Sequence, residues 1–124
     1  MDNKRPKHLA LHHIKLPLPG FVSILHRVSG LMLFLALPLL LLMLQYSLRS
    51  IETYTQLLSV LAHPLLKLML LVLLWAFLHH FCAGLRLLVI DLDYGVRLAQ
   101  ARNSSKVVLA VSMLLTVWIG IKLW

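Results

Sequence analysis

The sequence predicts an all-α membrane protein with three transmembrane helices, on the strength of two observations. Of its 124 residues, 60% are hydrophobic and only 13% are charged, whereas ordinary soluble domains are about 45–50% apolar and about 25% charged. A soluble domain of this size needs polar residues to cover its surface, and this chain has too few of them. The second observation is that the chain contains three apolar stretches, each close to the ~20 residues that cross about 30 Å of hydrocarbon.

The three stretches predict helices over residues 28–48, 65–90 and 107–124. The first has no charged residue, and its one interruption is Pro38. A membrane helix tolerates such a proline where neighbouring groups satisfy the freed carbonyl. The third is barely long enough to span, and Lys122 near its end is placed to reach the membrane surface. We expect residues 1–27 to form an N-terminal segment leading into the first helix.

The distribution of positive charge predicts the orientation of these helices. Lysines and arginines cluster in the N-terminal segment and in the loop after the second helix, namely Lys4, Arg5, Lys7, Lys15, Arg27, Arg97, Arg102 and Lys106. The opposite side has Arg49 and Lys122, with Lys67 just inside the second helix. The positive-inside rule then places the N-terminus in the cytoplasm, and we expect a bacterial inner membrane rather than a mitochondrial one. The formal net charge of +8 therefore needs no nucleic-acid partner to explain it.

The second predicted helix carries polar residues where a membrane is least tolerant of them. His79 and His80 lie near the middle of the span, so each needs a partner in the bundle. Such a histidine can bond a neighbouring helix, join a proton relay, or ligate a metal or haem iron. Helical spacing puts His80 between the small residues Ala76 and Gly84, which would give a flat ligand room. His79 lies about 100° around the helix and remains a competing candidate.

A second polar group lies at the entry to the first span. If this segment is helical, Ser23, His26, Arg27 and Gly30 share one face through i+3 and i+4 spacing. A hydroxyl, an imidazole and a guanidinium would then meet at the membrane surface. They would suit an oxygen-rich ligand such as a lipid phosphate, a haem propionate or a quinone carbonyl. The alternative is a snorkelling arginine beside a helix-capping serine.

The remaining candidate residues have simpler structural interpretations. We expect surface positions for the other histidines, which are His8, His12, His13 and His63. Cys82, the one cysteine, excludes a disulfide scaffold and reads as a small buried hydrophobe. Asp91 is expected to be a solvated loop carboxylate, or a member of a polar network with Arg86.

Two motifs resemble those of the cytochrome b membrane-anchor subunits of succinate dehydrogenase, or respiratory complex II. The first combines Arg5-Pro6 with the Ser-x-x-His-Arg-x-Ser/Thr pattern at residues 23–29. The second is His-x-x-x-Gly-x-Arg-His-x-x-x-Asp, present at residues 80–91 except that Leu87 replaces its second histidine. The resemblance covers the whole chain. Lys7 also follows the Arg-Pro pair where the family more often has an apolar residue.

The resemblance implies a site for each polar group. His80 would be the axial haem b ligand from this chain. The second axial ligand would be a histidine of a smaller three-helix anchor subunit, and the two subunits together would form a haem-binding bundle. Ser23 and Arg27 would form part of the ubiquinone site, and His26 with Arg27 would lie near the haem propionates. Any contact made by the family's second histidine would be absent at Leu87 or supplied by another residue.

The resemblance also implies an electron-transfer function shared with other chains. Partners would be the flavoprotein subunit, the iron–sulfur subunit and the second anchor, with ubiquinone as substrate. No residue of this chain suggests a dicarboxylate or flavin site, so we assign none a catalytic role. Two alternatives stay open: the anchor of a fumarate reductase, or a non-redox membrane subunit whose histidines only pack helices.

Overall fold

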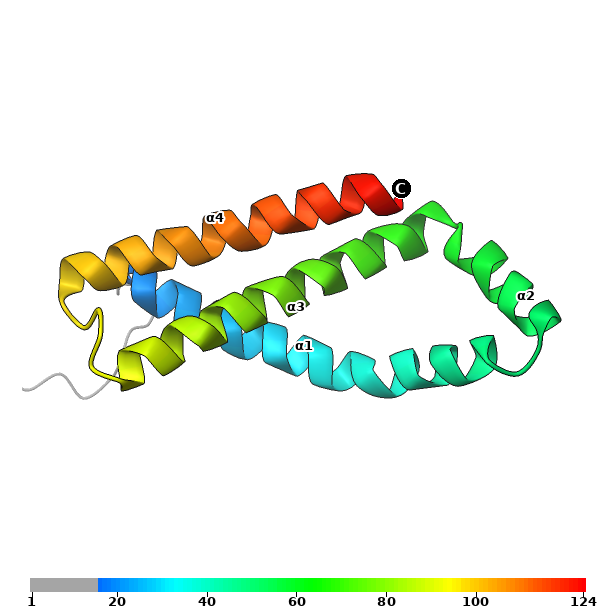
Figure 1. Ribbon diagram of the computed structural model, residues 1–124, viewed down its shortest axis with the longest axis horizontal. Coiled ribbons are helices and arrows are strands. Elements are labelled where there is room, and N and C mark those ends of the chain that lie inside the picture. The colour runs from blue at the N-terminus through cyan, green and yellow to red at the C-terminus, as the bar shows by residue number, and fades with distance from the viewer. Residues whose placement is uncertain (1–15) are drawn as a thin grey trace, which may run out of the picture.

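A computed structural model describes residues 16–124, which form four helices: α1 (Leu18–Ser47), α2 (Ile51–Leu61), α3 (Pro64–Asp91) and α4 (Leu98–Leu123). The three long helices are each apolar and long enough to cross a membrane, which confirms the predicted all-α, three-span architecture. Figure 1 shows α3 between α4 and α1, with α2 at one end of the bundle. Predictions for the first residues, including Arg5, Pro6, Lys7, His8, His12 and His13, lie outside the described residues.

Two helices begin earlier than the apolar stretches suggested. α1 starts at Leu18 rather than at residue 28, so it runs across the expected boundary between the N-terminal segment and the first span. Pro17 caps it in an extended conformation, and proline is favoured at this end of a helix because its missing N–H has no partner to lose there. α4 starts at Leu98 rather than at residue 107. Hydropathy marks only the part of a helix that lies in hydrocarbon, whereas the helix itself continues into polar surroundings.

The short helix α2 was not predicted from the sequence. Its start is fixed by a capping box, in which the Thr53 N–H donates to the Ser50 Oγ at 3.2 Å and the Ser50 N–H donates to the Thr53 Oγ1 at 3.0 Å. The Tyr46 hydroxyl donates to Gln56 at 2.7 Å, which ties the end of α1 to α2. With 11 residues α2 is too short to span a membrane. It connects α1 to α3 at the end of the bundle.

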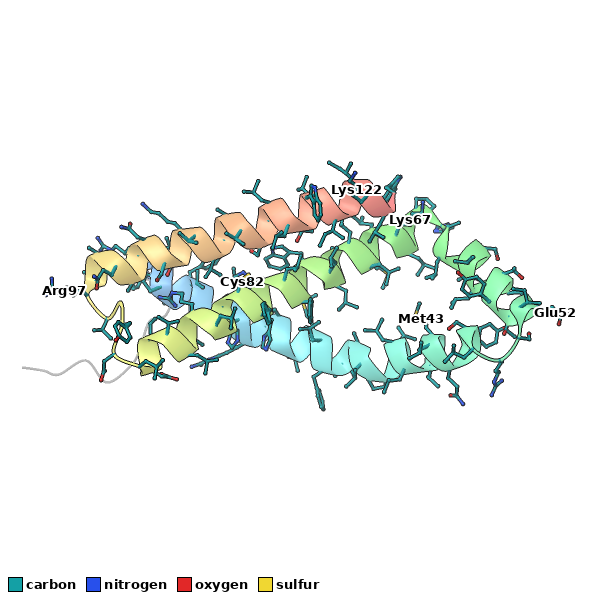
Figure 2. All side chains as sticks on the ribbon, in the orientation of Figure 1. Met43, Glu52, Lys67, Cys82, Arg97 and Lys122 are labelled. Carbon is teal, nitrogen blue, oxygen red and sulfur yellow. The ribbon has the colours of Figure 1, made fainter. Side chains whose placement is uncertain are left out.

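The bundle has its large apolar side chains outside and its polar ones inside. Phe34 is 72% exposed and Leu114 is 69% exposed, although both lie within predicted spans. The buried apolar cluster is small, with Val22, Ala83 and Val108 at the junction of α1, α3 and α4. Figure 2 shows side chains projecting from the outer faces of all three long helices. Such a surface is stable only where lipid or another apolar chain covers it.

Small polar side chains line the contact between α3 and α4. Ser105, Ser112 and Thr116 are all buried on α4. Each donates its hydroxyl to a carbonyl of its own helix, as Ser105 does to Ala101 and Thr116 does to Ser112, both at 2.7 Å. Because these side chains are short and internally satisfied, the two helices can approach closely in a membrane.

Arg86 joins α3 to α4 at the end of the bundle nearest the α3–α4 loop. Its Nε donates to the Ser104 Oγ at 2.9 Å and its Nη2 donates to the Ala101 carbonyl at 3.3 Å. Asp91, the last residue of α3, is exposed. The buried guanidinium is therefore satisfied by α4, and Asp91 is a solvated carboxylate, the first of the two environments expected for it.

We predict that Arg86→Ala destabilises the contact between α3 and α4. The change removes a two-point donor and leaves polar acceptors without their partner, a loss of about 1–3 kcal/mol. The measurement is the fraction of this chain that stays soluble when the detergent-purified assembly is heated in steps. Arg102→Ala is the matched control, since Arg102 is exposed on α4. Equal melting of the two variants would mean that the Arg86 contacts contribute nothing to stability.

Candidate functional site

His80 on α3 is held by the backbone of α1. Its Nδ1 lies 3.0 Å from the carbonyl oxygen of His26 and 3.4 Å from the Ser29 Oγ. These atoms lie where α1 and α3 pack together, at the level of the buried Ser29. The ring is half-buried at this contact, and the carbonyl sets the orientation of the imidazole.

This contact determines which ring nitrogen of His80 carries the proton. A carbonyl oxygen only accepts, so the Nδ1 must be the donor in this pair. In the neutral imidazole the other nitrogen, Nε2, then has a free electron pair. Within residues 16–124 the hydrogen-bonding contacts of this ring are made by Nδ1, and Nε2 makes none. The arrangement matches that of histidines that bind a metal through one nitrogen and donate the other to a carbonyl.

The His26 side chain lies against the His80 ring. The two ring centroids are 4.2 Å apart and the ring planes differ by 10°, a stacked arrangement. A Cβ placed on Gly84 would meet the His26 Nε2 at 3.5 Å, and one placed on Gly30 would lie 2.7 Å from the His80 Cε1. Ala76 is completely buried. Gly84 therefore faces His26 of α1 at an ordinary contact distance, and whether the small residues beside His80 also make room for a flat ligand stays a prediction.

Ser29 is the polar residue at this contact that we did not single out from the sequence. It is 1% exposed, and its hydroxyl donates to the His26 carbonyl at 2.9 Å. The same carbonyl thus accepts one hydrogen bond from Ser29 of its own helix and one from His80 of the neighbouring helix. The sequence does contain a pattern that could have identified it, because Ser29 occupies the final Ser/Thr position of the first motif.

Ser23 and Arg27 lie one helical turn apart near the start of α1. The segment is helical, as the proposed shared face requires. Ser23 is half-buried and Arg27 is exposed. The helix turns His26 toward α3, while the guanidinium of Arg27 stays accessible to a ligand or to another chain. The structure therefore places the half-buried His26 and the exposed Arg27 on different sides of α1.

His79 has a different environment from His80. It is completely buried, its ring stacks on Trp75 with centroids 5.3 Å apart, and neither of its nitrogens has a hydrogen-bond partner within the described residues. The backbone of Val22 approaches the ring without meeting hydrogen-bond geometry. A ring enclosed in this way offers no accessible nitrogen, so His79 is the weaker candidate for binding a ligand.

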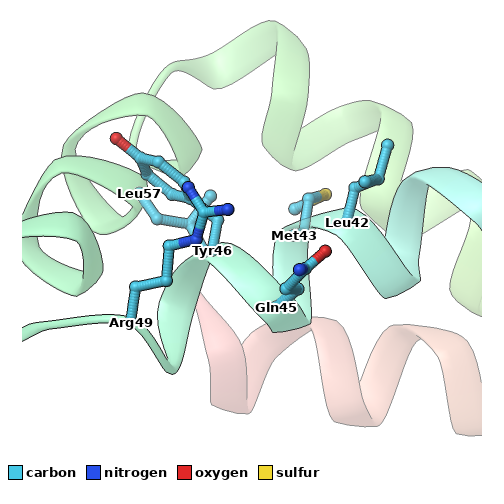
Figure 3. A pocket seen from close by; sticks show the side chains of 6 residues that line it. All are labelled: Leu42, Met43, Gln45, Tyr46, Arg49 and Leu57. Carbon is cyan, nitrogen blue, oxygen red and sulfur yellow. The ribbon is translucent and has the colours of Figure 1, made fainter.

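The hollows found on the described residues lie at the opposite end of the bundle. One is formed where α1 turns into α2, with Gln45, Tyr46, Arg49 and Leu57 among its lining residues (Figure 3). Another lies between α2, α3 and α4, next to Lys67, whose ammonium group is 4.8 Å from the centre of the Trp124 ring. Neither includes Ser23, His26 or His80. Within the described residues, the candidate site is identified by its polar contacts.

Comparison with known proteins identifies the family to which this chain is related. Residues 1–119 match the model of the succinate dehydrogenase/fumarate reductase transmembrane subunit. The chain is 35% identical over 125 residues to the succinate dehydrogenase cytochrome b556 subunit of Coxiella burnetii, covering 100% of both chains. It is 32% identical over 117 residues to the subunit of that name from Rickettsia felis, covering 92% of this chain and 89% of the relative.

The fold and the site together define a multi-pass helical membrane anchor. The chain belongs to the family of succinate dehydrogenase/fumarate reductase transmembrane subunits, and the relatives it matches are cytochrome b subunits from bacteria. The resemblance seen in its two motifs is thereby confirmed at the level of the whole chain.

We predict that Gly30→Ala disrupts the packing of His80 on α1. The added methyl group would lie 2.7 Å from the His80 Cε1 and 3.1 Å from its Nδ1, closer than such atoms can approach. The ring would have to move from the His26 carbonyl, at an expected loss of about 1–3 kcal/mol. The readout is again the thermal solubility of this chain in the purified assembly.

Gly20→Ala is the control for this prediction, because its added Cβ would make only an ordinary contact of 3.5 Å with Leu16. A helical Gly→Ala change without a clash is neutral or stabilises by about 0.5–1 kcal/mol. If Gly30→Ala melted at or above the Gly20→Ala variant, the close approach of Gly30 to His80 would be wrong.

Proposed function

We propose that this chain is the cytochrome b anchor of a bacterial succinate:ubiquinone oxidoreductase. In this proposal it binds haem b through His80 and forms part of the site where ubiquinone is reduced. It lies in the inner membrane with the N-terminal end of α1 at the cytoplasmic face. The distribution of lysine and arginine supports this orientation. Arg27, Arg97, Arg102 and Lys106 belong to the end of the bundle where α1 and α4 begin, and four more cations precede α1 in the sequence, whereas Arg49, Lys67 and Lys122 belong to the other end (Figure 1).

The observation that carries the haem proposal is the hydrogen bond from His80 Nδ1 to the His26 carbonyl. It orients the ring, leaves Nε2 as the electron-pair donor, and places this nitrogen in a low-dielectric bundle. An axial histidine needs these three properties. When bound, haem supplies one-electron redox chemistry beside the quinone. The second axial ligand would come from the smaller anchor subunit, and His26 and Arg27 would lie near the propionates.

Ser23 and Arg27 are the residues we propose for the quinone. A quinone carbonyl oxygen gains negative charge as it is reduced, and a nearby guanidinium stabilises that charge. Arg27 is exposed on α1, so its donors can reach a ligand at the membrane surface. Ser23, one turn earlier and half-buried, can donate a hydrogen bond to the same ligand. These side chains bind and orient the quinone, and electrons reach it from cofactors in other subunits.

The chain therefore acts within a complex. We propose that it assembles with a flavoprotein subunit, an iron–sulfur subunit and a second membrane anchor, and that it has no dehydrogenase activity alone. The family includes anchors of both succinate dehydrogenase and fumarate reductase, but the relatives compared here are named for succinate dehydrogenase. This naming favours succinate oxidation as the direction, and family membership argues against a non-redox packing subunit.

We predict that His80→Ala removes haem b from the purified complex while His79→Leu retains it. Alanine deletes the nitrogen that we propose binds the iron, so haem per complex should fall on the order of tenfold or more. Leucine at residue 79 removes only a buried ring whose nitrogens have no hydrogen-bond partner within the described residues. The measurement is the reduced-minus-oxidised absorbance of the b-type haem per mole of complex. Full haem in His80→Ala, or loss only in His79→Leu, would overturn the assignment.

We predict that Arg27→Leu separates the two half-reactions of the complex. Reduction of a ubiquinone analogue should fall by about 100-fold, because the charge developing on the quinone oxygen loses its stabilising cation. Oxidation of succinate by a soluble artificial acceptor should persist, since it does not use the membrane site.

Arg97→Leu is the matched control, because Arg97 is an arginine outside the proposed site, at the N-cap of α4. It should leave both activities unchanged. If Arg27→Leu reduced both activities equally, the arginine would serve assembly rather than quinone binding.

A further inference from the structure

We propose that Ser29 is a positioning residue that sets the strength of the hydrogen bond made by the His80 Nδ1, and so the electron-donor strength of its Nε2. This inference rests on the proposed function, because Nε2 is taken to bind haem iron. The inference assigns a role to Ser29, a residue that has none in the proposed function. Ser29 touches neither iron nor quinone in this proposal and acts only through His80.

The geometry joins three groups from two helices. The His26 carbonyl oxygen lies 2.9 Å from the Ser29 Oγ and 3.0 Å from the His80 Nδ1. The Ser29 Oγ also lies 3.4 Å from that Nδ1, where it can only accept, and at this distance the contact is much weaker than the 3.0 Å bond to the carbonyl. Ser29 is 1% exposed. Because solvent does not reach the hydroxyl, its donation to the carbonyl is not exchanged for a bond to water.

Other serines of the chain show that this geometry differs from ordinary helix behaviour. Ser47 and Ser112 also donate to the carbonyl three residues earlier, at 2.7 and 3.2 Å. Within the described part of the chain, neither of those carbonyls receives a donor from another helix. The Ala101 carbonyl is shared in a similar way, between Ser104, Ser105 and Arg86 of α3. Among the described residues, Ser29 is the serine whose acceptor oxygen also holds a histidine from α3. The hydroxyl therefore competes with the imidazole for one acceptor.

This competition has a definite electronic consequence. A carbonyl shared by two donors bonds each of them less strongly than it would bond one alone. A histidine whose N–H is bonded less strongly is a weaker base at its other nitrogen, since donating to an acceptor raises the basicity of a metal ligand. The Ser29 hydroxyl thus weakens electron donation to iron. Removing it should strengthen the bond from His80 and stabilise the ferric state.

The test is a redox titration of haem b in the intact complex in membranes, comparing Ser29→Ala with the unchanged chain. At a fixed ambient potential the ratio of reduced to oxidised haem should fall about threefold. This fall is a shift of about 30 mV to lower potential for a one-electron couple, at 59 mV per tenfold. Haem per complex should stay unchanged. An equal or higher potential in Ser29→Ala would overturn the proposal.

Three further variants separate tuning from structural effects. Ser29→Thr keeps the hydroxyl and should restore the original potential, whereas Ser29→Cys, a weaker donor, should give a value between the two. Ser112→Ala is the matched control, a buried serine on α4 with the same backbone bond, and should shift nothing. Loss of haem from assembled Ser29→Ala complexes would also count against tuning, because the hydroxyl would then be holding the site together.

The result can be told apart from failure of the proposed function. If His80→Ala loses haem but Ser29→Ala leaves the potential unchanged, His80 is the ligand and only the role of Ser29 is wrong. If His80→Ala retains haem, the haem assignment itself fails, whatever Ser29→Ala does to the potential.

Discussion

The contact between the His80 imidazole and the His26 carbonyl is the constraint on which the rest of the bundle depends. In a membrane no water is present to replace a lost hydrogen bond, so this pair fixes how α1 lies on α3. The close approach that it requires explains Gly30, which leaves room for the His80 ring, and Gly84, which faces His26. It also explains why Ser29 is buried without cost, because its hydroxyl finds an acceptor in the same carbonyl.

α3 is the central helix because it presents polar side chains to both neighbours. His80 bonds to α1, and Arg86, six residues later, bonds to α4. Six residues at about 100° each place these side chains roughly 120° apart around the helix axis. The two contacts therefore point to different neighbours, which agrees with the position of α3 between α1 and α4 (Figure 1). His80 and Arg86 of the second motif thus have a structural role beside any redox one.

Hydropathy and motif spacing predicted the spans well but their ends and contacts poorly. The apolar stretches located all three long helices, yet they missed the first turns of α1 and α4 and all of α2. Spacing alone could not choose between His79 and His80, which lie on one turn of one helix. Their environments differ because α1 supplies a carbonyl to His80 and none in bonding position to His79. Spacing left open whether Arg86 bonds to Asp91, whereas in the structure Ser104 and Ala101 on α4 satisfy it.

Composition and residue order were enough to establish a three-span membrane anchor, because lipid requires long apolar runs. They also singled out Ser23, His26, Arg27 and His80, because polar residues in or beside such runs are conspicuous. Folding decided the rest. The His26–His80 contact joins residues 54 positions apart, and no local pattern specifies which groups meet across such a distance. Only the packing of α1 against α3 determines that Nδ1 carries the proton, that Nε2 is left free, and that Ser29 shares the carbonyl between them.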